Sequence, residues 1–216
     1  ITQKPPQPGQ HATAGYPQAI LPPLHPHPPH PQFEDKPIPR EALERIMDAG
    51  LKAPSSNHQR RWELVALTDK VMILGLAKFI RPYPCRIQEP KTPQQEMFQI
   101  AYPRQRTMIE ESTCVILPWF QQKYPLSEDK NGYGLMDYGA AWALIENMLL
   151  AATAEGLGSV VHIPVKKEPG KIKEFLKAPD GWTLPALVVL GYPVQDPLLP
   201  AQVKATVENR VHWNKW

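Results

Sequence analysis

Cysteine is scarce in this sequence: the 216 residues include only Cys85 and Cys114. Neither lies in a CxxC pair, and no His/Cys spacing typical of zinc sites occurs, so a disulfide framework and a structural metal site are both disfavoured. We therefore expect no metal ion in the function. Two unpaired thiols fit a reducing compartment, and we expect a cytoplasmic protein.

Long apolar runs are also missing. The most hydrophobic stretch, 139–154, is interrupted by Glu146 and Asn147 and is too short for a membrane span. The N-terminus lacks the charged-then-apolar order of a signal peptide, and we expect no membrane partner. The formal net charge is only +3, with basic and acidic residues interspersed, so we expect no nucleic-acid partner.

Several catalytic motifs have no match. The sequence contains no Walker loop, no G-x-S-x-G elbow and no H-E-x-x-H pair, which weighs against phosphoryl transfer, serine hydrolysis and zinc proteolysis. The GxG runs at 132–134 and 156–158 lack the strand, G-x-G-x-x-G and helix order of a Rossmann domain. The second run follows a predicted long helix, where glycine commonly terminates the helix.

Proline, in contrast, is abundant and unevenly placed. Residues 1–32 hold ten of the 27 prolines and four of the seven histidines. Proline removes amide donors and blocks helix formation, so we predict that 1–32 is extended or disordered. Residues 33–216 have the composition of one packed domain.

Helix and strand patterns alternate along this domain. Amphipathic or buried helices are predicted within 36–53, at 70–79, at 137–158 and near 170–178, and apolar strands at 62–69, 112–120, 159–165 and 183–193. A polar stretch rich in Pro, Gln and Arg, from about 81 to 105, is predicted to be a lid-like excursion. The alternation indicates an α/β or α+β sheet covered by helices.

The run APSSNHQRRW (53–62) follows the first predicted helix. Ser55, Ser56 and Asn57 present short polar groups beside main-chain amides, which suits ribityl hydroxyls or carbonyl edges, and Arg60 and Arg61 add positive charge. An ordinary capped helix exit at the surface explains the same run equally well.

Four blocks in a fixed order resemble the FMN-dependent nitroreductase family. They are KPIPREALERIMDAGLKAPSSNHQRRWELVALTD (36–69), DYGAAWALIENMLLAATAEGLGSVVHIPV (137–165), LVVLGYP (187–193) and VENRVHWNKW (207–216). The resemblance implies an α+β three-layer sandwich, with a mostly antiparallel sheet flanked by helices. It also implies a homodimer that exchanges C-terminal arms and holds FMN at the subunit interface.

The resemblance further implies an activity. NAD(P)H would reduce FMN and leave, and an acceptor such as a nitroaromatic or a quinone would then occupy the same slot, in ping-pong order. No catalytic side chain is needed, because hydride transfer takes place at the flavin N5. Aromatic residues proposed to line the slot are Tyr83, Phe98, Tyr102 and Trp119.

The resemblance also assigns a cofactor-binding set, residue by residue. Residues 54–56 would line the flavin from the partner subunit. Residues 161–163 would form a strand end that packs on one flavin face, with the main-chain amide near Ile163 donating to N5. Lys204 would supply a cation to the phosphate. His58 replaces the family's usual Asn, Arg60 its frequent Gln, and Pro164 a common Gly, which removes one amide donor. The set is Pro54, Ser55, Ser56, Asn57, His58, Arg60, Val161, His162, Ile163, Pro164 and Lys204.

One family feature is replaced in this chain. The family's Arg-Arg-Ser-x-Arg run, which holds the phosphate, should precede Phe33, but HPPHP (27–31) stands there. Each lost charge-assisted contact would cost about 1.5–3 kcal/mol of FMN affinity unless His27, His30, Lys204 and a neighbouring Arg substitute for it.

Two other functions remain open at this point. The flavin could serve a dehydrogenase or oxidase of a small substrate. Alternatively, the chain could be a flavin-free interaction module whose Pro-rich segment binds aromatic grooves.

Overall fold

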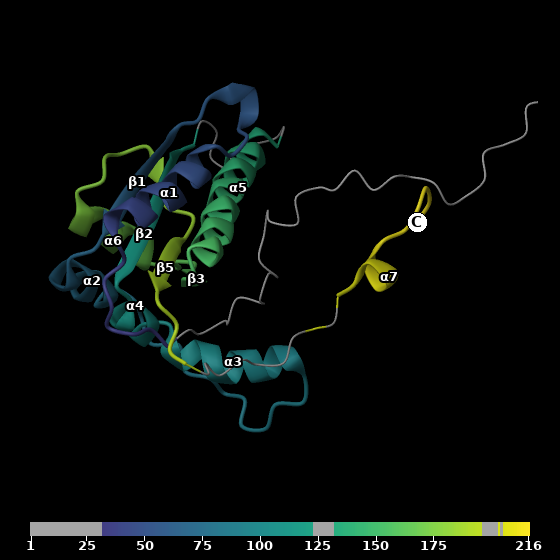
Figure 1. The fold of residues 1–216 in the computed structure, drawn as a ribbon, viewed down its shortest axis with the longest axis horizontal. Coiled ribbons are helices and arrows are strands. Elements are labelled where there is room, and N and C mark those ends of the chain that lie inside the picture. Colours follow the sequence, from purple (N-terminus) through teal and green to yellow (C-terminus); the bar gives the residue numbers. More distant parts are fainter. Residues whose placement is uncertain (1–31, 123–131, 196–202, 204) are drawn as a thin grey trace, which may run out of the picture.

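A computed structural model describes residues 32–122, 132–195, 203 and 205–216 (Figure 1). Its centre is a sheet in the order β1-β2-β5-β3, with the short strand β4 also paired to β2, and every one of these pairs is antiparallel. The antiparallel pairing decides between the two predicted classes in favour of α+β. The strands are β1 (Trp62–Leu67), β2 (Cys114–Gln121), β3 (Gly158–His162), β4 (Trp182–Thr183) and β5 (Leu187–Gly191).

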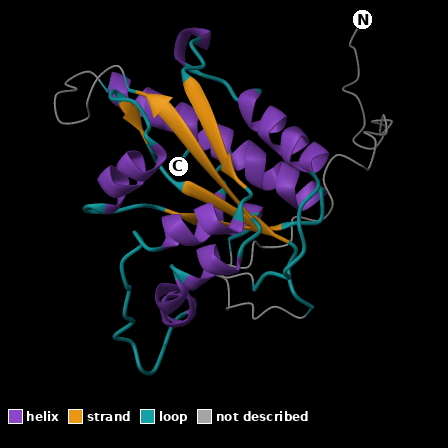
Figure 2. Cartoon of the chain, turned by 90° about the vertical axis from the view of Figure 1, so that its left-hand side faces the viewer, coloured by secondary structure: helices purple, strands orange, loops and turns teal. Residues whose placement is uncertain are grey.

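Helices cover both faces of the sheet, which gives three layers (Figure 2). One face packs against α1 (Arg40–Leu51) and α5 (Tyr133–Ala154), and the other against α2 (Lys70–Ala77), α4 (Thr107–Glu111) and α6 (Glu168–Leu176). Side chains of β2 alternate between the two cores, with Ile116 on the α5 side and Val115 and Leu117 on the α2 side, as the two-residue strand period requires. The predicted three-layer sandwich is confirmed.

Local chemistry sets several helix ends. Asp69 caps α2 by accepting the N–H groups of Val71 and Met72. Helix α5 ends where Gly156 takes a left-handed φ of 74° and the N–H of Leu157 donates to the Ala152 carbonyl, which confirms the predicted glycine terminator. Gly50 in α1 is required for a different reason: a Cβ there would lie 2.6 Å from Met148 Cγ, so glycine permits the close approach of α1 and α5.

The predicted elements differ from the structure in several places, and α4 was not predicted. The excursion after residue 80 contains a helix that was not predicted, α3 (Pro93–Arg104), which starts at Thr92 with its hydroxyl accepting the Gln95 N–H. Helix α5 starts at Tyr133, four residues before the predicted 137. The predicted strand 183–193 is divided into β4 and β5, because Pro185 lies between them and cannot donate to a strand pair.

The N-terminal end of the domain packs against the sheet, whereas its C-terminal helix does not. Phe33 forms a bridge with Pro193 and packs on Gly191, so the packed region begins near the predicted boundary at 33. Apart from Gln32, the segment predicted to be extended lies outside the described residues. At the other end α7 (Val207–Arg210) stands apart from the sheet (Figure 1). Among the described residues, none of the helices combines the length and apolar character needed to cross a bilayer.

Candidate functional site

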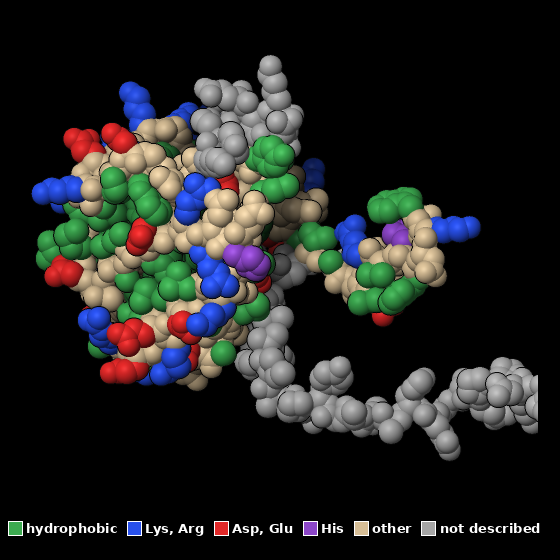
Figure 3. All heavy atoms as spheres, turned by 90° about the horizontal axis from the view of Figure 1, so that it is seen from above, with side chains coloured by type: hydrophobic (Ala, Val, Ile, Leu, Met, Phe, Trp, Pro, Cys, Tyr) green, Lys and Arg blue, Asp and Glu red, His purple; other side chains and the backbone are tan. Residues whose placement is uncertain are grey.

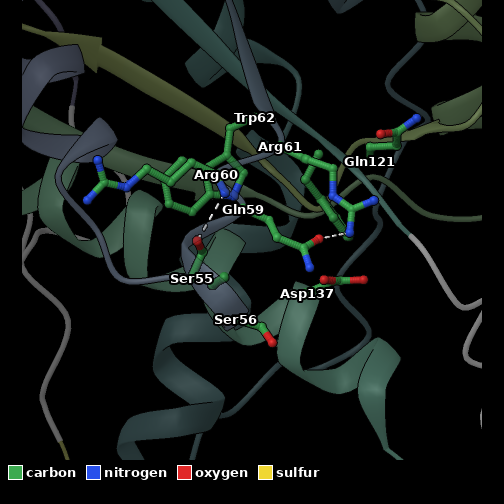
Figure 4. Close-up of a pocket in the computed structure, with 10 residues that line it drawn as sticks. Ser55, Ser56, Gln59, Arg60, Arg61, Trp62, Gln121 and Asp137 are labelled. Atoms are coloured by element: carbon green, nitrogen blue, oxygen red, sulfur yellow. Dashed lines mark hydrogen bonds between the residues drawn. The ribbon is translucent and has the colours of Figure 1, made fainter.

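The run after α1 forms an ordered loop rather than a simple helix exit. It includes a short 3-10 turn, η1 (Ser56–His58), and the N–H of Arg60 donates to Ser55 Oγ at 3.0 Å (Figure 4). Asn57, His58 and Arg60 have left-handed φ values of 51°, 52° and 45°. Such conformations cost on the order of 1–3 kcal/mol each for non-glycine residues, and they concentrate at binding sites.

This loop faces the first half of α5 across a hollow of about 330 Å³. The lining is mostly apolar and includes a glycine and two alanines of α5, and no atom lies within 4 Å of the position that a Cβ at residue 139 would take. Two serine hydroxyls stand at the rim. An apolar surface with hydroxyls beside it fits a planar ring with polar substituents. The lining residues are Pro54, Ser55, Ser56, Met136, Gly139, Ala140 and Ala143.

A small polar pocket adjoins the hollow, with Ser55, Ser56 and Ala140 common to both. The Arg61 guanidinium donates to the Gln59 side chain, and Asp137 of α5 and Gln121 of β2 also line this pocket. Figure 4 shows Arg61 directed to the same side as Asp137, whereas the Arg60 side chain extends away from it. Arg61 therefore places a cation beside the hollow, next to hydrogen-bonding groups.

The second half of the predicted site, residues 161–164 at the end of β3, does not line the hollow. Val161 packs toward the α5 core, and Pro164 is buried. The His162 ring points into the protein, with Nδ1 2.7 Å from Gln105 Oε1 and Nε2 3.3 Å from Glu168 Oε2. Ile163 alone is well exposed, at 54 %. The loop 54–61 contacts the first half of α5, whereas His162 and Val165 at the β3 end are hydrogen-bonded to Glu168 of α6.

Other predicted residues have mixed outcomes. Lys204, His27 and His30 lie outside the described residues. Of the proposed slot aromatics, Phe98 and Tyr102 form a ring pair with centroids 4.9 Å apart, and Tyr83 lies beside Tyr102. Trp119 was wrongly placed in the slot, because it is buried in the core between the sheet and α2.

Two buried groups have shifted pKa values that bear on reactivity. Burial raises the pKa of the Cys114 thiol to about 12, so this cysteine stays protonated and is no nucleophile. Burial also lowers the pKa of His162, and the opposing effect of Glu168 is smaller, so the ring is neutral near pH 7. Its Nε2 faces the Glu168 carboxylate, and its Nδ1 lies beside Gln105 Oε1, while the Gln105 side-chain NH2 donates to the Ala101 carbonyl.

The free energy of unfolding is expected to fall as the pH drops below about 6.5. His162 has a lower pKa in the folded chain than its ordinary 6.5, so the unfolded chain binds the proton first. The slope from this one residue is at most about 1.4 kcal/mol per pH unit, the limit for one proton. Urea unfolding at pH 7.5 and 5.5 should show this loss of unfolding free energy, and His162→Gln should remove the part that His162 contributes. His212→Gln, at an exposed ring, should leave it unchanged; an equal slope in all three proteins would contradict the assignment.

The model of the Nitroreductase family matches residues 31–192. The chain belongs to the Nitroreductase family. The resemblance found in the sequence is thus confirmed. A relative named putative NADH dehydrogenase/NAD(P)H nitroreductase, from Archaeoglobus fulgidus, is 25 % identical over 186 residues, which cover 85 % of this chain and 91 % of the relative.

Solved structures of Nitroreductase-family proteins share the fold. A putative NADH dehydrogenase/NAD(P)H nitroreductase from Parabacteroides distasonis superimposes with a TM-score of 0.62 at 23 % identity, covering 88 % of this chain and 94 % of that one. An FMN-dependent nitroreductase from Clostridium difficile gives 0.60 at 21 % identity, covering 86 % and 93 %. Both likenesses establish the fold of this chain.

Sequence reasoning missed several residues that line the hollow and its polar neighbour. Met136, Gly139, Ala140 and Ala143 lie at helical spacing on one side of α5, but α5 is apolar nearly all round, so the sequence did not single out this side. Asp137 and Gln121 carried no signal, because only the fold brings them together. Glu168 was missed because a glutamate in KKEPG resembles an ordinary solvated helix start.

Proposed function

We propose that this chain is an FMN-dependent oxidoreductase that transfers electrons from NAD(P)H to a small acceptor such as a nitroaromatic or a quinone. The observation that carries the proposal is the hollow between residues 54–56 and α5, with its mostly apolar lining and its serine hydroxyls. Membership of the Nitroreductase family supports it, as do relatives named NAD(P)H nitroreductase and FMN-dependent nitroreductase.

The described residues fit FMN. Met136, Gly139 and Ala140 offer an apolar surface to a flat ring, and Ser55 and Ser56 offer hydroxyls to its polar edge. Arg61 adds a cation beside them, and its attraction for negative charge grows where water is excluded. Lys204 remains the residue predicted to reach the phosphate. When bound, FMN supplies the redox chemistry by accepting two electrons from NAD(P)H and passing them to the acceptor.

The role of the protein is then to bind and orient. The exposed Ile163, with its main-chain amide, would complete the site from the β3 end. Tyr102 and Phe98 of α3 provide an aromatic surface for a flat substrate. Because one slot serves the reductant and the acceptor in turn, we propose ping-pong kinetics.

A second copy of this chain is the proposed partner. Leu135, Met136 and Trp142 leave an exposed apolar face on α5, and such a face marks an interface. The C-terminal arm, 205–216, has exposed Trp213 and Trp216 and stands apart from the rest of the domain (Figure 3). We propose a homodimer in which each arm crosses to the other subunit and residues 54–58 of one copy meet the β3 end of the other. Cytoplasmic location stays a prediction from the cysteine content.

The proposal predicts a flavin spectrum that bleaches. Purified protein mixed with FMN should retain it through gel filtration, and anaerobic NADH or NADPH should then remove the visible absorbance. Free FMN with the same reductant is the control. A colourless protein that leaves FMN fluorescence unchanged would support the interaction module instead. Bound flavin that NAD(P)H does not reduce, but that a small organic substrate does, would support the dehydrogenase or oxidase alternative.

A further inference from the structure

A second polar cluster lies at the start of α6, separate from the loop 54–62. Glu168 and His162 are 3 % and 1 % exposed. Within the part of the chain that the structure describes, Glu168 is the one buried carboxylate. Burying a carboxylate costs free energy unless donors surround it, so its partners indicate what it holds.

Donors reach this carboxylate from separate segments of the chain. Oε1 accepts the N–H of Arg81 at 2.9 Å, and Oε2 accepts the N–H of Val165 at 2.9 Å. The Tyr83 hydroxyl lies 3.1 Å from both oxygens. Burial alone would raise the pKa of Glu168, but these amides, His162 and Tyr83 together hold it below its ordinary value, so the carboxylate is ionised near pH 7.

These bonds fix the turn between β3 and α6. Lys166 in this turn has a left-handed φ of 56°, a conformation that needs support from its surroundings. Val165 is held through its N–H and His162 through its ring, and both are held by Glu168. Ile163 and Pro164 lie between these two anchors. The main chain of Ile163 is therefore constrained from both sides, although its side chain is exposed.

The same cluster reaches the segment that was predicted to be a lid. The Tyr83 ring meets the His162 ring edge-on, with centroids 5.9 Å apart, and lies 6.3 Å from the Tyr102 ring of α3. Arg81 sits 4.3 Å above the Tyr83 ring. One carboxylate thus links the β3 end, α6 and the segment that leads to α3.

We propose that Glu168 is a positioning residue: its carboxylate holds the turn 163–167 and the segment 81–83 in one arrangement and so sets the place of the Ile163 main-chain amide. The inference rests on the proposed function, because the place of this amide matters to the reaction only if a flavin binds beside it. Glu168 acts through Val165, His162 and Tyr83, and it does not itself face the hollow.

The test is Glu168→Gln in the full-length protein. Glutamine keeps the shape of the side chain. In the wild type each carboxylate oxygen accepts a main-chain N–H, from Arg81 or from Val165, and the glutamine NH2 group cannot accept, so at least one of these two bonds is lost. Amide hydrogen exchange in peptides covering 159–168, measured without FMN, should become about 10-fold faster or more, while β2 peptides should not change. With FMN, kcat should fall about 10-fold, whereas the Kd for FMN should change less than about 3-fold.

Two further variants complete the experiment. Glu174→Gln, exposed on the same helix, should behave as wild type in every measurement. Tyr83→Phe removes the hydroxyl that donates to Glu168 and keeps the ring. It should speed amide exchange and lower kcat in the same direction as Glu168→Gln but by less, and it replaces that variant as the test if Glu168→Gln does not fold.

The outcomes separate the two proposals. Unchanged amide exchange at 159–168 in Glu168→Gln would show that the carboxylate does not hold the turn 163–167, whether or not flavin binds. Faster exchange with wild-type kcat would overturn the positioning role and leave the proposed function standing. A wild-type protein that does not bind FMN would overturn the proposed function, and the positioning role with it.

Discussion

Phe120→Ala is expected to lower the free energy of unfolding by about 3–5 kcal/mol. Phe120 is almost fully buried near the end of β2 and packs against Tyr138 of α5, with ring centroids 4.9 Å apart and an interplanar angle of 73°. Truncation removes the apolar contacts and leaves a cavity between the sheet and α5, beside the small polar pocket that Phe120 also lines. Urea unfolding at one fixed protein concentration measures the change, because the stability of a dimer depends on concentration.

The matched control for Phe120→Ala is Val71→Ala. Val71 is exposed on α2, so its truncation should change stability by less than about 0.5 kcal/mol. Phe120→Leu should lie between the two, since most of the buried volume is kept. Equal stability of Phe120→Ala and wild type would show that β2 and α5 are not packed as described.

Met136→Glu is expected to raise the Kd of the homodimer about 100-fold or more. Met136 lies on the apolar outer face of α5 and lines the hollow. In a symmetric dimer each interface contains the substitution twice, and a carboxylate buried without a partner is costly. Sedimentation velocity across micromolar concentrations, with and without FMN, measures the oligomeric state.

Val71→Glu is the control for the charge itself. It adds the same carboxylate on α2, on the opposite side of the sheet, and should remain dimeric. If Met136→Glu remains as dimeric as Val71→Glu, the outer face of α5 is not the interface and the proposed arrangement of two copies is wrong.

The helices and strands that the sequence predicted well share one property. In α1 the apolar residues repeat with the helical period, and β1 and β2 are short, mostly apolar runs, so these elements are marked in the sequence. Helix α3 was missed because Pro, Gln and Arg dominate the segment and its side chains are mostly half-buried or exposed. Its start at Thr92 and Pro93 was the one local signal.

The candidate site was predictable in its residue types and not in its geometry. The hydroxyls of Ser55 and Ser56 lie beside the hollow, as the run 53–62 indicated. The left-handed conformations of Asn57, His58 and Arg60 were not predictable, because non-glycine residues adopt them only when surrounding packing compensates. Figure 4 shows the Arg60 and Arg61 side chains extending from this loop in different directions.

By itself, the sequence determined the family, the order of the predicted strands and of α1, α2, α5 and α6, and the short polar loop after α1, because each depends on residue order and local periodicity. Only the tertiary structure decided which side of α5 stays exposed, since a helix that is apolar nearly all round carries no direction in its sequence. It also decided that Glu168 is buried. The donors of this carboxylate come from residues 81, 83 and 165, and segments that far apart in the chain meet only when the sheet and its helices have packed.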